Sequence, residues 1–303
     1  MGRLPRDTRG AALVRTATTI AEVRLWRREQ AGTVGLVPTM GYLHAGHLSL
    51  LEAARRENDR VVASLFVNPT QFGPSEDYAA YPRDLERDRG LLEQAGCGLL
   101  FAPAAAEMYP PGTETTVDAG SLAASLEGAR RPGHFRGVAT VVLKLLQITT
   151  PDRAYFGEKD AQQLAVVRRL VADLDVPVEV RGCPTVRESD GLAMSSRNGY
   201  LTPEERRAAT VLHRALDAAE ALWRSHERRG EALRRAMEAT LAKEPLARVD
   251  YASVVDPESF RELEVAAEAA RLCLAVFFGT TRLIDNRLLE APAVGARLTP
   301  LSF

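Results

Sequence analysis

The sequence contains no long apolar segment and few cysteines. No uninterrupted apolar run approaches the roughly 18 residues that a membrane-spanning helix needs, and residues 1–10 are basic but lack the apolar core of a signal peptide. The three cysteines, Cys97, Cys183 and Cys273, are widely spaced, form no metal-type pair, and are odd in number, which argues against a disulfide framework. We therefore expect a protein of the reducing cytoplasm that has no membrane partner.

The chain also lacks excess charge of one sign and two common catalytic motifs. Its formal net charge is −1, which gives no support for a general attraction to nucleic acid. It has no Gly-x-x-x-x-Gly-Lys-Ser/Thr segment, which excludes P-loop enzymes, and no Gly-x-Ser-x-Gly nucleophile elbow. The 303 residues, 46% of them hydrophobic, are enough for two domains of ordinary size with buried cores.

The most informative segment is 34–55, in which a short apolar run is followed by a turn, two histidines and a helix. Residues 34–37 suit a buried strand, a proline and a glycine then interrupt regular structure, and apolar residues recur at helical spacing from Leu48. His44 and His47 therefore lie at the start of a helix, where backbone N–H groups and the helix dipole favour phosphate. The alternative is a pair of ordinary surface or capping histidines. Two histidines with His-x-Gly-His spacing, after a strand and before a helix, favour the phosphate site.

Strand and helix patterns alternate through the first part of the chain and then change. Short apolar strands are expected at 34–37, 60–67, 98–102, 153–156 and 178–181, with helices between them, the clearest at 161–174. Long helical stretches follow from 203 to about 241, with a break expected near Gly230, and then strands at 249–255, 271–278 and 281–285. The sequence therefore predicts an α/β fold, a Rossmann-like parallel sheet with helices on both faces, followed by a smaller α+β domain with helices on an antiparallel sheet. The expected domains are 1–183 and 184–289, with a loosely held tail at 290–303.

Two further loops add charge and hydrogen-bond donors to the predicted phosphate site. The loop at 157–163 contains Lys159, which can balance phosphate charge, and Asp160, which either accepts a hydrogen bond from a ribose hydroxyl or caps the next helix. The loop at 194–198 offers two hydroxyls and a guanidinium to phosphate oxygens, although such a tripeptide is common by chance. In parallel sheets, ligands bind outside the carboxyl ends of the strands, so these loops are expected to line one crevice.

Five other side chains are weaker candidates. Gln71, His134 and Arg136 lie in loops, where side chains of these types are most often solvated. Asp88, with Glu86 nearby, is suited to holding a divalent cation near phosphates, and a solvated helix face explains both carboxylates equally well. The two histidines of the phosphate site have no cysteine or carboxylate partners at zinc-site spacing, so structural zinc is not expected.

Taken in order, these segments resemble a known family. His44–His47 (His-Ala-Gly-His) resembles the first signature of the nucleotidyl-transferase superfamily, which includes class I aminoacyl-tRNA synthetases, and Met194–Arg197 resembles its second signature, a phosphate-binding loop. Longer sequence segments resemble those of the pantoate–β-alanine ligase family. These segments are 38–41, 66–72, 81–83, 131–135, 156–163, 194–198 and 279–286. The resemblance is dense from about residue 20 to 200 and thinner in the carboxyl-terminal part.

The resemblance implies an enzyme that condenses pantoate with β-alanine to pantothenate, a step of coenzyme A biosynthesis. Pantoate and ATP form pantoyl adenylate and pyrophosphate, and the amine of β-alanine then displaces AMP. The implied catalytic residues are His44, His47 and Lys159, with both histidines on the ATP phosphates and His47 assisting the departure of pyrophosphate. The other implied ATP-binding residues are Met40, Gly157, Asp160, Val186, Met194, Ser195, Ser196 and Arg197, and those for pantoate or β-alanine are Gln71 and Gln163.

Further expectations concern the metal, the assembly and the second domain. We expect Mg²⁺ to bridge the ATP phosphates, with Asp88 as its candidate protein ligand. The resemblance implies a homodimer formed through the amino-terminal domain. The net charge of −1 leads us to expect no nucleic-acid partner, and we expect the second domain to act as a lid.

Two other functions stay open at this point. One is a different adenylyl- or cytidylyl-transferase with a phosphorylated acceptor, although a phosphate acceptor favours basic residues where Gln71 and Gln163 stand. The other is a non-catalytic nucleotide-binding module, against which the intact His44, His47 and Lys159 argue. A tRNA synthetase is disfavoured by the neutral net charge, the short chain and the lack of an anticodon-binding domain.

Overall fold

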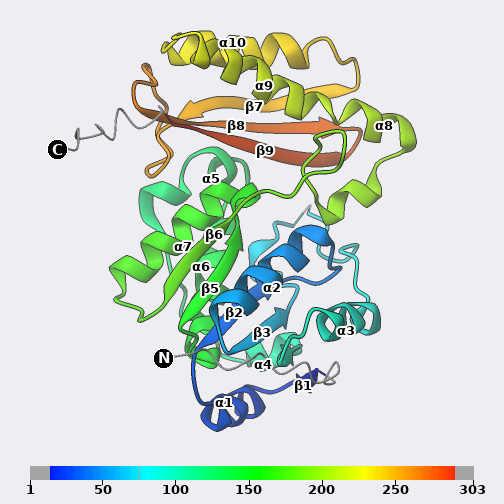
Figure 1. Ribbon diagram of the computed structural model, residues 1–303, viewed down its shortest axis with the longest axis vertical. Helices are drawn as coiled ribbons and strands as arrows, with labels where there is room; N and C mark the ends of the chain where they lie inside the picture. The colour runs from blue at the N-terminus through cyan, green and yellow to red at the C-terminus, as the bar shows by residue number, and fades with distance from the viewer. Residues whose placement is uncertain (1–13, 75, 291–303) are drawn as a thin grey trace, which may run out of the picture. The chain divides into compact units, whose positions relative to one another are not determined.

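The computed structural model describes residues 14–74 and 76–290, and they form two compact units (Figure 1). The first unit runs to Arg187 and includes Met194–Ser196, whereas the second contains Glu188–Ala193 and the residues from Arg197 onwards. The expected tail lies outside the described residues except for Glu290, which ends a strand. No helix in 14–74 or 76–290 combines the length and the apolar character that a bilayer crossing requires.

The first unit is built on a six-stranded sheet in which every pairing is parallel. Its strands, given in chain order, are β1 Arg15–Ala17, β2 Val34–Thr39, β3 Arg60–Leu65, β4 Leu99–Phe101, β5 Arg153–Gly157 and β6 Glu179–Cys183. The spatial order is β1-β4-β3-β2-β5-β6. From β2 the chain therefore adds strands first on one side and then, from β5, on the other, which makes the boundary between β2 and β5 the topological switch point where ligands are expected to bind.

Helices cover both faces of this sheet. The longer helices of the unit are α1 Ile20–Glu29, α2 Ala45–Glu57, α3 Leu85–Gln94, α6 His134–Thr149 and α7 Ala161–Asp173, and the short ones are α4 Ala105–Met108 and α5 Leu126–Arg130. On one face, Leu51 of α2 and Leu92 of α3 share a core with Val37 and Tyr155 of the strands. The strand residues next to these two point the opposite way, and α6, which contacts β2, α1 and α7, covers that second face (Figure 1).

The second unit is a three-stranded antiparallel sheet covered by helices on one face (Figure 1). Its elements are α8 Pro203–Ala208, α9 Val211–Arg224, α10 Gly230–Leu241, β7 Ala247–Val255, β8 Ala269–Phe278 and β9 Thr281–Glu290. Leu216 of α9 and Met237 of α10 pack with Leu274 and Val276 of β8 in one core. Both predicted architectures, the Rossmann-like parallel sheet and the smaller α+β unit, are confirmed, while the role of the second unit as a lid stays a prediction.

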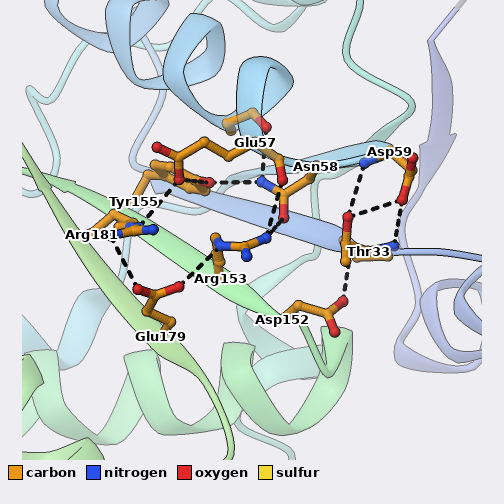
Figure 2. Close-up of polar contacts among 11 residues, drawn as sticks. Thr33, Glu57, Asn58, Asp59, Asp152, Arg153, Tyr155, Glu179 and Arg181 are labelled. Atoms are coloured by element: carbon orange, nitrogen blue, oxygen red, sulfur yellow. Dashed lines mark hydrogen bonds and ion pairs between the residues drawn. The ribbon is translucent and has the colours of Figure 1, made fainter. Parts of the chain in front are cut away.

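A polar network joins the carboxyl-terminal end of α2 to β5 and β6 (Figure 2). Glu57 accepts a hydrogen bond from the Tyr155 hydroxyl at 2.9 Å and forms an ion pair with Arg181 at 3.2 Å. Asn58 donates to the same hydroxyl at 2.7 Å and accepts from Arg153 at 3.2 Å. Burial, followed by the Glu57 carboxylate, raises the pKa of Tyr155 to about 12, so the hydroxyl remains a donor. The network therefore fixes the helix whose other end carries the histidine pair.

Candidate active site

The two histidines of the predicted phosphate site form a capping box at the start of α2. His44 is the N-cap residue, and its Nδ1 accepts the backbone N–H of Gly46 at 3.1 Å. His47, three residues on, accepts the backbone N–H of His44 through its own Nδ1 at 3.3 Å. The ring centroids are 4.0 Å apart. Both rings therefore act as caps and still stand as a pair, because each caps the helix through Nδ1 and leaves Nε2 outside the capping box.

This arrangement determines which nitrogen carries the proton. A backbone N–H can only donate, so Nδ1 of each ring is an acceptor and the proton of the neutral ring lies on Nε2. Burial, and then the charge of Lys159, lower the pKa of His44 to about 4. Burial, the neighbouring His44 and Lys159 lower the pKa of His47 to about 3. At neutral pH the pair consists of two uncharged Nε2–H donors.

Gly46 leaves room for the His44 ring, which folds back over it. A Cβ atom built on Gly46 would lie 2.9 Å from Cε1 and 3.0 Å from Nδ1 of the His44 ring. Such a Cβ would also lie 3.9 Å from the Cβ of Met194, which places the predicted second phosphate loop beside the start of α2. The backbone N–H of Met194 donates to Val186 at 3.0 Å, so these two predicted ATP-binding residues are also joined.

The depressed pKa values of the pair predict a loss of stability in mild acid. Unfolded histidine has a pKa near 6.5, so as the pH falls below that value the unfolded chain takes up protons before the folded chain does. The contribution of His44 and His47 is complete above about pH 6.5 and is lost as the pH falls towards about 4 and 3. We expect each to lower the free energy of unfolding by up to about 1.4 kcal/mol per pH unit. Urea midpoints at pH 7.5 and 5.0 measure this, and a His47→Asn variant should show a shallower decline; equal slopes would contradict the assignment.

Asp88 braces the loop that precedes the histidines. Its side chain is 2% exposed, and its two carboxylate oxygens accept the backbone N–H groups of Tyr42 at 2.6 Å and Leu43 at 2.8 Å. Burial raises the pKa of this carboxyl, although both backbone bonds oppose that shift. Gly41 lies beside it with φ +90°, and a Cβ there would approach an Asp88 oxygen at 3.2 Å. The geometry supports a brace and not the expected magnesium ligand, and no cluster of three or more His, Cys, Asp or Glu suited to a metal occurs among residues 14–74 and 76–290.

The loop after β5 brings Lys159 and Asp160 to the switch point. Glu158–Asp160 form a single 3₁₀ turn between β5 and α7. Asp160 stands at the N-cap position of α7, but its side chain makes no capping hydrogen bond, so the capping alternative is not realised. Its carboxylate lies 3.9 Å from the Lys159 ammonium. Lys159 contributes to the lowered pKa of both histidines, which shows that its charge acts on the same site.

Gln71 is buried and its amide is oriented, unlike a typical loop glutamine. It ends the 3₁₀ turn Pro69–Gln71 after β3 and is 8% exposed. Its Nε2 donates to the Met40 sulfur at 3.2 Å, and its Oε1 accepts from Asn68 at 3.1 Å. Asn68 lies in the segment 66–72 that resembles the family, but nothing in its local pattern indicated that its amide would hold the Gln71 side chain.

The two neighbouring glutamines of α7 have different environments. Gln162 is 5% exposed and its amide bonds to the backbone of Leu122, Ser125 and Glu127, which is a structural role. The Gln163 side chain is half-buried and makes no hydrogen bond to another described residue, so its amide is available to a ligand. The loop at 194–198 is divided between the two units. The Ser196 hydroxyl lies 3.3 Å from the Tyr81 hydroxyl within the first unit, and Arg197 belongs to the second unit.

The fold and the site define a class of protein. A parallel sheet whose switch point lies between β2 and β5, with a His-x-Gly-His pair on the helix after β2 and a lysine after β5, is the arrangement of an α/β nucleotide-binding protein. A family model described as pantoate-beta-alanine ligase matches residues 14–288. The chain belongs to the pantoate–β-alanine ligase family.

Individual relatives agree along almost their full length. The pantothenate synthetase of Roseiflexus sp. (strain RS-1) is 63% identical over 278 residues, which is 92% of this chain and 100% of that protein. The crystal structure of pantothenate synthetase from Thermus thermophilus is 56% identical, with a TM-score of 0.87 over 91% of this chain and 99% of that one. The pantoate-β-alanine ligase of Francisella tularensis, complexed with β-γ ATP and β-alanine, is 36% identical, with a TM-score of 0.76 over 91% of this chain and 97% of that one. These matches confirm the family and leave no support for a different nucleotidyl transferase.

Proposed function

We propose that the chain is an AMP-forming pantoate–β-alanine ligase whose site lies at the carboxyl ends of β2 and β5. The observation that carries this proposal is the His44–His47 pair, which presents two Nε2–H donors beside Lys159 at the switch point of a fold shared with this family. In the first step a pantoate carboxylate oxygen bonds to the α-phosphorus of ATP, and the bond to the β-phosphate oxygen breaks to release pyrophosphate. In the second step the β-alanine nitrogen bonds to the acyl carbon, loses a proton, and AMP leaves with the former carboxylate oxygen.

The chemistry of the first step suits neutral hydrogen-bond donors. In-line attack at phosphorus requires the protein to position the reactants and to stabilise developing charge, and it does not require a covalent nucleophile. We assign the phosphate contacts to His44, His47 and Lys159 as the catalytic residues. Other phosphate contacts are assigned to Ser195, Ser196 and Arg197, and the adenosine side to Met40, Gly157, Asp160, Val186 and Met194.

Pantoate is assigned to two neutral amides, Gln71 and Gln163. An amide can orient a hydroxyl and a carboxylate without a cation that would reduce the nucleophilicity of the attacking oxygen. The burial and fixed orientation of Gln71, and the unoccupied amide of Gln163, support this assignment. β-Alanine is placed at the same side of the crevice, since its amine must reach the acyl carbon of the adenylate.

Finer statements about the metal, the location, the assembly and the second unit belong to the same proposal. ATP would enter as its Mg²⁺ complex, in which the metal would offset phosphate charge as part of the substrate, and no protein ligand is assigned to it. The enzyme acts as a cytoplasmic homodimer, binds no nucleic acid or membrane, and uses its second unit as a lid. Sedimentation at several protein concentrations tests the homodimer, and a monomer throughout would contradict it.

The deciding experiment is ATP–pyrophosphate exchange with labelled pyrophosphate. We expect exchange that requires pantoate and does not require β-alanine, followed by stoichiometric AMP release when β-alanine is added. No exchange with pantoate, from protein shown to be folded by circular dichroism, would overturn the proposal. Retention of the nucleotide in the product would indicate a transferase.

A further inference from the structure

A buried histidine lies behind the Gln71 turn and belongs to none of the groups assigned above. His134 is the first residue of α6 and is 8% exposed. Its Nδ1 lies 2.8 Å from the backbone oxygen of Gln71, and its Nε2 lies 3.1 Å from a guanidinium nitrogen of Arg131. A carbonyl oxygen can only accept and a guanidinium can only donate, so the ring is the Nδ1–H tautomer. This is the opposite tautomer from that of the phosphate pair.

The ring is held from behind by an ion pair. Arg131 forms two hydrogen bonds of 2.7 Å each with the carboxylate oxygens of Glu76, in a bidentate arrangement that fixes the guanidinium plane. Burial, and then the Arg131 charge, lower the pKa of His134 to about 4, so the ring is neutral at working pH. A directed series of hydrogen bonds therefore runs from Arg131 to His134 and from His134 to the Gln71 backbone.

The same first turn of α6 also fixes the side chain of Gln71. Asn68 donates to the backbone oxygen of Gly137 at 3.1 Å and to Gln71 Oε1 at 3.1 Å. A Cβ built on Gly137 would lie 2.3 Å from the backbone oxygen of Thr70, so the helix and the turn touch backbone to backbone. Backbone and amide of Gln71 are thus both positioned by one helical turn.

We propose that His134 is the positioning residue for substrate recognition by Gln71, and that it sets the affinity for the hydroxy acid without acting on ATP. The proposal rests on the proposed function, in which the Gln71 amide holds pantoate. In this arrangement His134 contacts Gln71 and Arg131 and is not assigned a contact with either substrate. Its N–H holds the Gln71 carbonyl, and loss of that bond leaves a buried acceptor unsatisfied and lets the turn shift.

The test compares three variants by steady-state ATP–pyrophosphate exchange. His134→Ala is expected to raise the KM for pantoate about 10- to 100-fold, with the KM for ATP unchanged within about twofold. His134→Asn, whose amide N–H can occupy the place of Nδ1–H, is expected to restore most of the affinity for pantoate. The matched control is Arg136→Ala in the same turn of α6, which removes only an exposed ion pair with Asp118 and should leave both KM values unchanged.

Two outcomes would overturn the proposal. One is an unchanged KM for pantoate in His134→Ala, and the other is an equal rise in both KM values that His134→Asn does not reverse, which would indicate a structural role alone. The tautomer offers a test that needs no variant, since ¹⁵N chemical shifts of the wild-type protein should report Nδ1–H at His134, and Nε2–H would refute the assignment. A wild-type protein without any pantoate-dependent exchange would count against the proposed function, while the tautomer result would still decide the hydrogen-bond series.

Discussion

Replacing His47 by alanine is expected to lower kcat/KM for pantoate-dependent ATP–pyrophosphate exchange by about 10²- to 10³-fold, the usual cost of removing one donor from a developing negative charge. In the proposed site, His47 presents Nε2–H to the phosphates, while its Nδ1 accepts the N-cap backbone N–H of His44. The alanine variant therefore loses a donor to the departing pyrophosphate and also one half of the capping box. Loss of the cap should cost about 0.5–2 kcal/mol of stability.

An asparagine at the same position separates these two effects. In His47→Asn the side-chain oxygen can accept the His44 N–H, but no donor reaches the position of Nε2. We expect a urea midpoint close to that of the wild type together with an activity as low as that of His47→Ala. Full turnover in either variant would remove His47 from the machinery and reopen the interpretation of the chain as a passive nucleotide-binding module.

Elements with strong local patterns were predictable from the sequence, and those that depend on distant partners were not. The helix expected at 161–174 is α7, Ala161–Asp173, and the strand expected at 60–67 is β3, Arg60–Leu65. In contrast, β1 occupies only Arg15–Ala17, which is too short for any periodicity and exists because it pairs with β4. Residues 203–241 show two helix breaks, near Thr210 and at 225–229, of which only the one near Gly230 was expected.

The site shows the same division. His44 and His47 were found by spacing alone, because a strand, a turn and a helix start are local features. The brace from Asp88 to Leu43 spans 45 residues and the bond from His134 to Gln71 spans 63, so neither has a signal in the neighbouring sequence. Asp88 looked like a metal ligand because an aspartate near phosphates is typical of one, whereas burial against two backbone N–H groups gives it a different task.

Lys159→Met is expected to have the second large effect, and it acts on two observables at once. Removing the ammonium takes a positive charge from the proposed phosphate site, and we expect kcat for exchange to fall by about 10²-fold or more. The same charge disfavours protonation of both imidazoles, so its removal should raise the pKa of His44 and of His47. Burial is the larger cause in each case, so both values should rise and still stay below 6.5. NMR titration of the ring signals measures the pKa values in the free protein, and exchange measures the activity.

Arg87→Met provides the comparison that makes the electrostatic result specific. The charge of Arg87 lowers the pKa of His44 but does not contribute to the lowered pKa of His47. Arg87→Met should therefore raise the pKa of His44 and leave that of His47 unchanged. Lys159→Met should raise both, because the lysine stands at the switch point between β2 and β5, where its charge reaches the whole capping box. If Lys159→Met raised the pKa of only one histidine, or kept full activity, Lys159 would not face the phosphate side of the crevice. A rise in both histidine pKa values would show that the cation after β5 and the two neutral donors after β2 act on one anion site. Such a site can hold a polyphosphate in place for in-line attack at this sheet edge.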